Sequence, residues 1–211
     1  MLSAIVVAAG NSSRFGGKLS KVLAKIGGNP ALFYPLNTLN SHPGVDEIIV
    51  VANPANAGRI AALARKHKFN KVKKVVLGGK ERCDSVFNGL KYVGRNINYV
   101  LIHDGARPLI SPKTVSSVIL AAKRSKAAIA AVPVKATLKK AGKGLLIKKT
   151  VARNGIWEAQ TPQVFLKEII VKAYSDKRRA GSTDDAVLAE EMGFKVRLVL
   201  GKEANIKITT P

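Results

Sequence analysis

Two cations close a loop of small residues near the amino terminus. Arg14 and Lys21 lie seven residues apart in the stretch 8–21, which reads Ala-Ala-Gly-Asn-Ser-Ser-Arg-Phe-Gly-Gly-Lys-Leu-Ser-Lys. Small residues let backbone N–H groups approach an anion, so with two cations the loop favours a polyanionic ligand, a nucleoside triphosphate or a sugar phosphate. The spacing fits neither the Walker nor the dinucleotide-binding pattern. Taken alone, the loop would equally fit a plain connection between a strand and a helix.

A second group of candidate residues surrounds an aspartate. Asp104 follows an apolar run and precedes Gly-Ala-Arg107, and a turn aspartate paired with that arginine is an even alternative to a binding role. His103 is more readily a packed histidine than a catalytic one, because the three histidines lack the spacing of a metal site. With later cations at Arg153 and Lys207, the set fits nucleotidyl transfer. That reaction needs charge stabilisation on phosphates, a positioned phosphate nucleophile and a divalent ion, but no side-chain nucleophile.

Alternating strands and helices are expected to position these residues. Buried strands are predicted at 4–7, 47–51, 72–77, 99–102 and 127–132, and short strands at 195–200 and 206–209. Helices are predicted at 30–39, 57–68, 114–126, 166–174 and 184–192, with another from Asp84 or Ser85 to Val93. Asn53-Pro54 is expected to start the helix over 57–68. In an open α/β sheet ligands bind outside the carboxyl ends of the strands. The opening loop, Gly79 with Ser85, and Asp104 would therefore meet at one edge.

The alternation with helices lapses between 133 and 153. Two β-prone segments around Gly142 and Gly144 predict a hairpin with little core of its own. Projecting hairpins commonly clasp another subunit, so we expect a homodimer. The chain has no internal repeat or linker, and we expect a single domain over 1–211 with the arm at about 133–153.

The composition is strongly basic. A net charge of +23 arises from 36 Lys and Arg against 13 Asp and Glu, but the cations are scattered and the aromatic residues, 5% of the chain, do not interleave with them. We therefore expect solvated basic faces that steer anionic substrates and no nucleic-acid partner.

No apolar run approaches the roughly 20 residues of a membrane span. The apolar run at the amino terminus is not followed by a processing site, so we expect a cytoplasmic protein without a membrane partner. Cys83 is the single cysteine, which excludes an intrachain disulfide.

Seven motifs in order resemble the 2-C-methyl-D-erythritol 4-phosphate cytidylyltransferase family over essentially the whole chain. They are Ala8-Ala9-Gly10 with Arg14 and Lys21, Gly78-Gly79-x-x-Arg82-x-x-Ser85-Val86, His103-Asp104-Gly105-Ala106-Arg107-Pro108, Pro133-Val134-x-x-Thr137-Leu138-Lys139, Arg153-Asn154-Gly155-x-Trp157-x-x-Gln160-Thr161-Pro162-Gln163-x-Phe165, Thr183-Asp184-Asp185 and Asn205-Ile206-Lys207-Ile208-Thr209. Each motif is weak alone, but their order and spacing together are specific.

The resemblance implies an α/β fold, a Rossmann-like nucleotidyltransferase three-layer sandwich with a mostly parallel sheet and a projecting β-hairpin dimerisation arm. It also implies that methylerythritol 4-phosphate attacks the α-phosphate of CTP, with Mg²⁺, to give cytidine-diphospho-methylerythritol and pyrophosphate in isoprenoid precursor biosynthesis. The implied catalytic residues are Arg14, Lys21, Arg153 and Lys207. Those implied to seat the cytosine are Ala8, Ala9, Gly79 and Ser85. Those implied to hold the acceptor are Asp104, Arg107, Thr161, Thr183 and Lys207, with Thr137 and Arg153 reaching the site of the neighbouring subunit. Gly10 and Gly105 are also implied to bind substrate.

The chain departs from the family pattern at several positions. Ser20-Lys21-Val22 stands where the family usually has Pro-Lys-Gln, Ser12 replaces a glycine, and Lys80, Ala136 and Ala152 replace acids. The family usually continues beyond the Lys207 strand into a helix, whereas this chain ends at Pro211, so we expect weaker support for Lys207. Two alternatives stay open: a ribitol 5-phosphate cytidylyltransferase, and a catalytically weakened basic relative that binds nucleic acid. The retained cations and Asp104 argue against the second.

Overall fold

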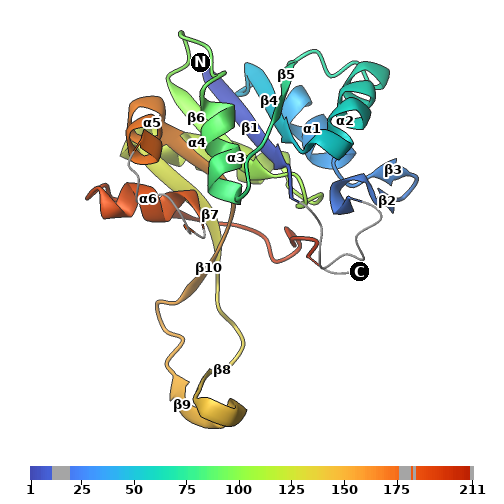
Figure 1. The fold of residues 1–211 in the computed structure, drawn as a ribbon. Coiled ribbons are helices and arrows are strands. Elements are labelled where there is room, and N and C mark those ends of the chain that lie inside the picture. Colours follow the sequence, from blue (N-terminus) through green and yellow to red (C-terminus); the bar gives the residue numbers. More distant parts are fainter. Residues whose placement is uncertain (11–19, 176–181, 183, 210–211) are drawn as a thin grey trace.

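A central sheet separates two layers of helices (Figure 1). The computed structural model of the 211-residue chain describes residues 1–10, 20–175, 182 and 184–209. Within these residues the sheet has seven strands in the order β11-β7-β10-β6-β1-β4-β5. Their bounds are β1 (Leu2–Ala8), β4 (Glu47–Ala52), β5 (Val72–Leu77), β6 (Tyr99–Asp104), β7 (Ala127–Pro133), β10 (Trp157–Leu166) and β11 (Arg197–Leu200).

The helices divide between the two faces of this sheet. They are α1 (Phe33–Ser41), α2 (Pro54–Lys66), α3 (Arg82–Leu90), α4 (Pro112–Ser125), α5 (Lys167–Ser175) and α6 (Asp185–Glu191). Side chains of β1 alternate between the faces, as the period of a strand requires. Val6 packs into a core with α1, α2 and α4, whereas Ile5 packs into a second core with α3, α5 and α6. The expected three-layer sandwich is confirmed.

The parallel strands bring the predicted loops to one edge. β1 pairs in parallel with both β4 and β6, and β4 pairs in parallel with β5. Val7 is therefore level with Asp104 on β6, and Ala8 is level with Ala52 on β4. Because the carboxyl ends of these strands coincide, the residues that follow β1, β5 and β6 lie close together.

Strand β10 differs from the expectation, because the sequence pattern predicts no strand at 157–166. The segment carries polar residues and Pro162, which has no N–H for a ladder and usually marks a strand edge. In the structure β10 lies antiparallel to both β6 and β7, and its register with β7 shifts between Ala159 and Gln163. That irregularity accommodates the proline inside the sheet. It also places Thr161 and Gln163 beside the end of β6.

Several other elements differ from the sequence prediction; α1, for example, begins at Phe33 and not at residue 30. Helix α2 begins at Pro54 with Asn53 as its cap, which confirms the predicted start at Asn53-Pro54 and adds one turn before the predicted range 57–68. Helix α3 begins at Arg82, since Asp84 accepts a hydrogen bond from the Glu81 N–H inside the first turn and does not cap the helix. No strand forms at 206–209, where the Ile208 N–H donates to the Ala106 carbonyl in a turn that offers no strand edge.

The predicted arm is present as a separate hairpin. β8 (Leu138–Ala141) pairs antiparallel with β9 (Ile147–Val151), and the 3-10 helix η3 (Lys143–Leu145) connects them. Figure 1 shows the hairpin projecting well away from the sheet. A second small element, 3-10 helix η2 (Lys21–Leu23), precedes the two-residue strands β2 (Lys25–Ile26) and β3 (Asn29–Pro30). None of the helices in the described ranges has the length and hydropathy of a membrane span.

Candidate active site

A cavity of about 310 Å³ opens at the carboxyl edge of the parallel strands. Its lining comes from the ends of β1, β5 and β6, from the start of α3, from η2 and from the segment after β11. The lining residues that matter below are Ala8, Ala9, Gly10, Lys21, Gly79, Arg82, Ser85, Asp104 and Lys207. Nearly all of the predicted nucleotide-contacting residues that the structure describes are thus brought together. We call this space the first cavity.

A second cavity of about 250 Å³ adjoins the first. It is lined mainly by β10 and the start of α6, with Arg107, Thr161, Gln163 and Asp184 among its residues. Arg82, Asp104 and Lys207 line both cavities. These three side chains therefore form a shared wall, which is the place where a group could pass from one ligand to another.

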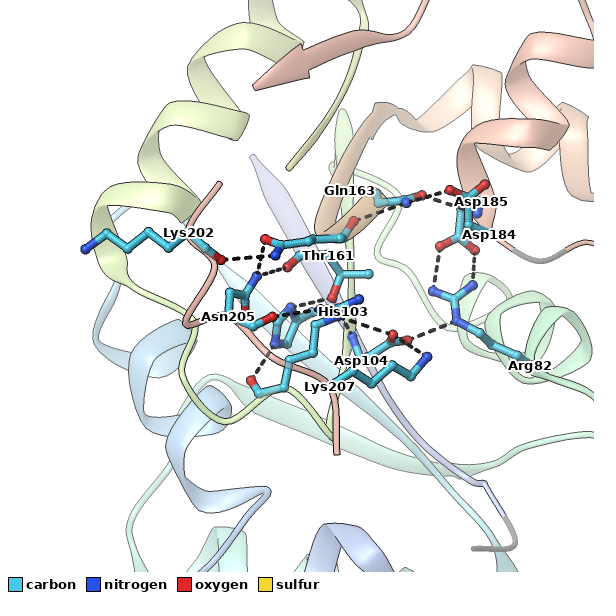
Figure 2. Close-up of polar contacts among 12 residues, drawn as sticks. Arg82, His103, Asp104, Thr161, Gln163, Asp184, Asp185, Lys202, Asn205 and Lys207 are labelled. Carbon is cyan, nitrogen blue, oxygen red and sulfur yellow. Dashed lines mark hydrogen bonds and ion pairs between the residues drawn. The ribbon is translucent and has the colours of Figure 1, made fainter. Parts of the chain in front are cut away.

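Asp104 is the centre of the charged network at this wall (Figure 2). Its carboxylate lies 3.0 Å from Arg82 Nε and 2.8 Å from Lys207 Nζ, with Arg107 Nε at 3.7 Å. Burial alone would raise the pKa of Asp104, but Arg82 and Lys207 outweigh it and hold that pKa well below its usual range. Asp104 is therefore an ionised group that can only accept hydrogen bonds, as from the hydroxyls of a ligand. The ion pair with Asp104 also holds the Lys207 side chain in place, although the sequence predicted that this residue would be less firmly held.

Arg82 is the site residue that the sequence reasoning missed. Its Nη1 and Nη2 donate to the two carboxylate oxygens of Asp185 at 2.9 and 2.8 Å, while its Nε donates to Asp104 (Figure 2). Burial opposes the charge, but the two carboxylates raise the pKa of Arg82 well above its usual value. The available signal was its place three residues after Gly79, in a motif already quoted for the resemblance.

His103 is packed under the site, as expected for a lone histidine after an apolar strand. It is fully buried, with Nε2 lying 3.2 Å from the Arg107 carbonyl and Nδ1 lying 2.9 Å from Thr161 Oγ1. A carbonyl can only accept, so the proton sits on Nε2 and Nδ1 accepts from the Thr161 hydroxyl. Thr161 Oγ1 in turn accepts from the Asp104 N–H at 3.1 Å. Because the hydrogen of the Thr161 hydroxyl is used in the bond to His103, its oxygen can only accept a hydrogen bond from a ligand in the second cavity.

This buried histidine makes stability depend on pH. Burial is the main cause that lowers the pKa of His103 from 6.5 to about 4. A lowered folded-state pKa gives stability that is complete above pH 6.5 and is lost as the pH falls toward 4. We expect His103→Gln to be less stable than wild type at pH 7, and this difference in unfolding free energy to shrink by about 3 kcal/mol at pH 4. Denaturant titrations at several pH values measure the unfolding free energy of both proteins. A difference between them that stays the same from pH 7 to pH 4 would contradict the lowered pKa of His103.

The first cavity also presents a hydrogen-bond acceptor, the Ser85 hydroxyl. Ser85 Oγ donates to the Glu81 carbonyl at 3.1 Å and accepts from the Gly79 N–H at 3.2 Å. A β-carbon at Gly79 would come within 2.3 Å of Asp84, so the turn needs glycine there. Since the hydroxyl hydrogen of Ser85 is committed to Glu81, its remaining lone pair can only accept, for example from an amino group.

Comparison with known proteins agrees with this geometry. The family model for 2-C-methyl-D-erythritol 4-phosphate cytidylyltransferase matches residues 2–211. This chain belongs to that family. The cytidylyltransferase of that name from Caldanaerobacter subterraneus subsp. tengcongensis is 45% identical, over 100% of this chain and 94% of the relative, and the one from Dehalococcoides mccartyi is 42% identical, over 100% and 91%.

Solved structures of the family share the fold. The 4-diphosphocytidyl-2C-methyl-D-erythritol synthase of Anaerococcus prevotii matches with a TM-score of 0.85 at 32% identity, covering 99% of this chain and 92% of that one. The cytidylyltransferase of Thermus thermophilus matches with a TM-score of 0.80 at 30% identity, covering 98% and 92%. The resemblance on which the sequence analysis relied is therefore confirmed.

Not every residue expected to act in this cytidylyltransferase family site lies in it. Thr137 and Arg153 are exposed on and beside the arm, and an Arg153 guanidinium nitrogen donates to the Lys135 carbonyl, so the structure of one chain does not bring them to the cavities. Arg14 and Thr183 lie outside the described residues. Gly105 lies beneath the site, where a β-carbon would come within 2.8 Å of a Leu32 methyl group.

The described residues do not form a metal site of their own. They contain no group of three or more His, Cys, Asp or Glu side chains that could hold an ion. Asp104, the acid at the shared wall, already faces cations on both oxygens. A divalent metal is typical of nucleotidyltransferases, and Mg²⁺ is commonly held by substrate phosphates and water with few protein ligands.

Proposed function

We infer that this protein transfers the cytidylyl group of CTP to 2-C-methyl-D-erythritol 4-phosphate, giving 4-diphosphocytidyl-2-C-methyl-D-erythritol and pyrophosphate for isoprenoid precursor synthesis. The observation that supports it is the pair of cavities that share a wall of Arg82, Asp104 and Lys207. One cavity suits a nucleotide, the other suits a small polyol phosphate, and family membership favours this acceptor over ribitol 5-phosphate.

The first cavity would hold the nucleotide. Its base end has the Ser85 oxygen, which can accept from the exocyclic amino group of cytosine, where uracil carries an acceptor. Lys21 lines the same cavity and is proposed to contact the triphosphate, while the backbone of Ala8 and Ala9 is proposed to help seat the cytosine. Arg14, from the same loop, is proposed as the second cation on the triphosphate. We propose that the nucleotide brings Mg²⁺ on its phosphates.

The second cavity would hold the acceptor. Asp104 and Thr161 offer oxygens that accept from the polyol hydroxyls, while Arg107 and Lys207 supply positive charge near the phosphate. A phosphate oxygen of the acceptor attacks the α-phosphorus of CTP as the bond to the β-phosphate oxygen breaks and pyrophosphate leaves. The acceptor phosphate carries its own nucleophilic oxygen, so positioning and charge stabilisation supply the catalysis. Thr183, next to Asp184 in the sequence, is proposed to join this end.

The proposal is tested by pyrophosphate release. We expect release with CTP and methylerythritol phosphate together, and at most slow release when UTP, ATP or GTP replaces CTP. Ribitol 5-phosphate serves as the alternative acceptor, and turnover with it alone would reject our acceptor assignment. Retention on nucleic acid that weakens with salt, without pyrophosphate release, would instead favour the nucleic-acid-binding alternative.

We also propose that the arm completes the site of a second subunit. The hairpin carries Thr137 and Arg153 away from the cavities of its own chain, and it forms no sheet with the body. If Arg153 acts in the partner's site, Lys21→Ala and Arg153→Ala homodimers are both nearly inactive, but mixing and re-equilibrating them restores about a quarter of wild-type activity. That recovery arises because each mixed dimer keeps one site with both residues. A mixture that stays inactive although mixed dimers form would contradict the proposal.

A further inference from the structure

Asp185 is a fully buried carboxylate that lines neither cavity. Both of its oxygens are bonded to Arg82, and Oδ1 also accepts from the Tyr174 hydroxyl (Figure 2 shows the Arg82 bonds). Its backbone N–H donates to the Gln163 side chain at 3.2 Å. Asp185 therefore ties the start of α6 to α3, α5 and β10 at one point, behind the wall that the two cavities share.

The geometry of this pair restricts Arg82 strongly. A bidentate bond between a guanidinium and a carboxylate fixes both the position and the plane of the guanidinium. With two bonds to Asp185, the Nε–H of Arg82 is aimed at Asp104, which it meets at 3.0 Å. Three of the five N–H groups are used in these bonds, which leaves two further donors on a side chain that lines both cavities.

Stability alone does not account for such a pair. Removing two charges from water is costly, and apolar replacements of buried ion pairs are often as stable as the pair itself. A buried carboxylate beside a reaction site is better explained by what it holds in place. Here it holds the arginine that orients Asp104, the group facing the hydroxyls of the acceptor.

We propose that Asp185 is a positioning residue for the acceptor: it clamps Arg82 in the wall between the cavities, and Arg82 in turn fixes the Asp104 carboxylate. The inference rests on the proposed function, because it assigns the acceptor to the second cavity. Tyr174 is part of the device, since its hydroxyl donates to Asp185 from α5. Loss of the clamp lets the guanidinium rotate, and Asp104 then loses one of its two closest cations.

The test compares Asp185→Asn with its matched control Glu191→Gln, which makes the same acid-to-amide change at an exposed position of α6. We expect Asp185→Asn to raise the KM for methylerythritol phosphate about 10-fold or more and to lower kcat, while the dissociation constant of CTP alone changes less than about 2-fold. For the control Glu191→Gln we expect the acceptor KM, kcat and the dissociation constant of CTP to equal those of wild type. An unchanged acceptor KM, or an equal loss of CTP affinity, would overturn the proposal.

A double-mutant cycle separates positioning from a general structural role. If Asp185 acts through Arg82, the double variant Arg82→Lys with Asp185→Asn is no worse in kcat/KM for the acceptor than Arg82→Lys alone. If the double variant instead loses kcat/KM by the product of the two single-variant factors, the inference is overturned. If Asp185→Asn does not fold, Tyr174→Phe decides, with an expected rise in acceptor KM of about 3-fold at constant CTP affinity. Wild-type protein without CTP-dependent pyrophosphate release would reject the proposed function itself.

Discussion

Replacing Lys21 with alanine is expected to lower kcat by about two to four powers of ten, roughly 3–5 kcal/mol of transition-state stabilisation. Lys21 lines the first cavity from η2, together with the shared wall residues Asp104 and Lys207. Negative charge builds on the leaving pyrophosphate during transfer, and a fixed ammonium group in a partly closed cavity stabilises that charge more than water does. Steady-state kinetics with saturating CTP and acceptor measure the effect.

The matched control for Lys21 is Lys25→Ala. Lys25 is an exposed lysine four residues later, in β2, and it lines neither cavity. Its removal changes the net charge by the same amount, so any loss due only to weaker attraction of anionic substrates appears in both variants. We expect the control to keep kcat, and both variants to unfold at nearly the wild-type denaturant midpoint. A Lys21→Ala enzyme with near-normal kcat would remove Lys21 from the mechanism.

Asp104→Asn is expected to raise the KM for the acceptor by about 100-fold and to lower the unfolding free energy by about 3 kcal/mol. Asn keeps the size of the side chain but removes the charge that Arg82, Arg107 and Lys207 face. These cations then repel one another in a partly buried space. Its amide group also places a donor where the acceptor hydroxyls need an oxygen. Glu190→Gln, an exposed change at the end of α6, is the control for charge alone.

The pH dependence of this variant gives a second check. Since the folded-state pKa of Asp104 is lowered, its contribution to stability is complete above the unfolded value of about 4 and is lost as the pH falls below it. The stability gap between wild type and Asp104→Asn should therefore be constant between pH 5 and 7 and narrow at more acidic pH. A gap that persists unchanged to about pH 2 would mean that the ion pairs do not cause it.

Local sequence patterns predicted most of the fold. Apolar runs with branched residues became the parallel strands, and helices such as α4 lie within one or two residues of their predicted bounds. The pattern did not reveal β10, because Pro162 and neighbouring polar residues look unlike a buried strand when read alone. Only the partners on both sides, β6 and β7, supply the hydrogen bonds and the burial that make the segment a strand.

For the site, too, some features could be predicted from the sequence and others could not. The identity and order of its motifs are enough to indicate the family, and the edge where Ala8, Gly79 and Asp104 meet follows from the direction of parallel strands. The network of Arg82, Asp185 and Tyr174 does not follow from any local pattern, because its residues are 103 and 11 positions apart in the sequence. Their contact depends on how α3, α5 and α6 pack on one face of the sheet.

The sequence by itself determined the alternation of elements, the edge that carries the chemistry and the types of group present there, since these depend on short-range periodicity and composition. The tertiary structure decided which cation faces which carboxylate, that Thr161 and Ser85 act as acceptors, and that two cavities share one wall. Hydrogen-bond direction and the balance of charge against burial depend on atoms brought together from distant segments. That is why the contacts of Arg82 with Asp104 and Asp185 became visible only in the folded chain.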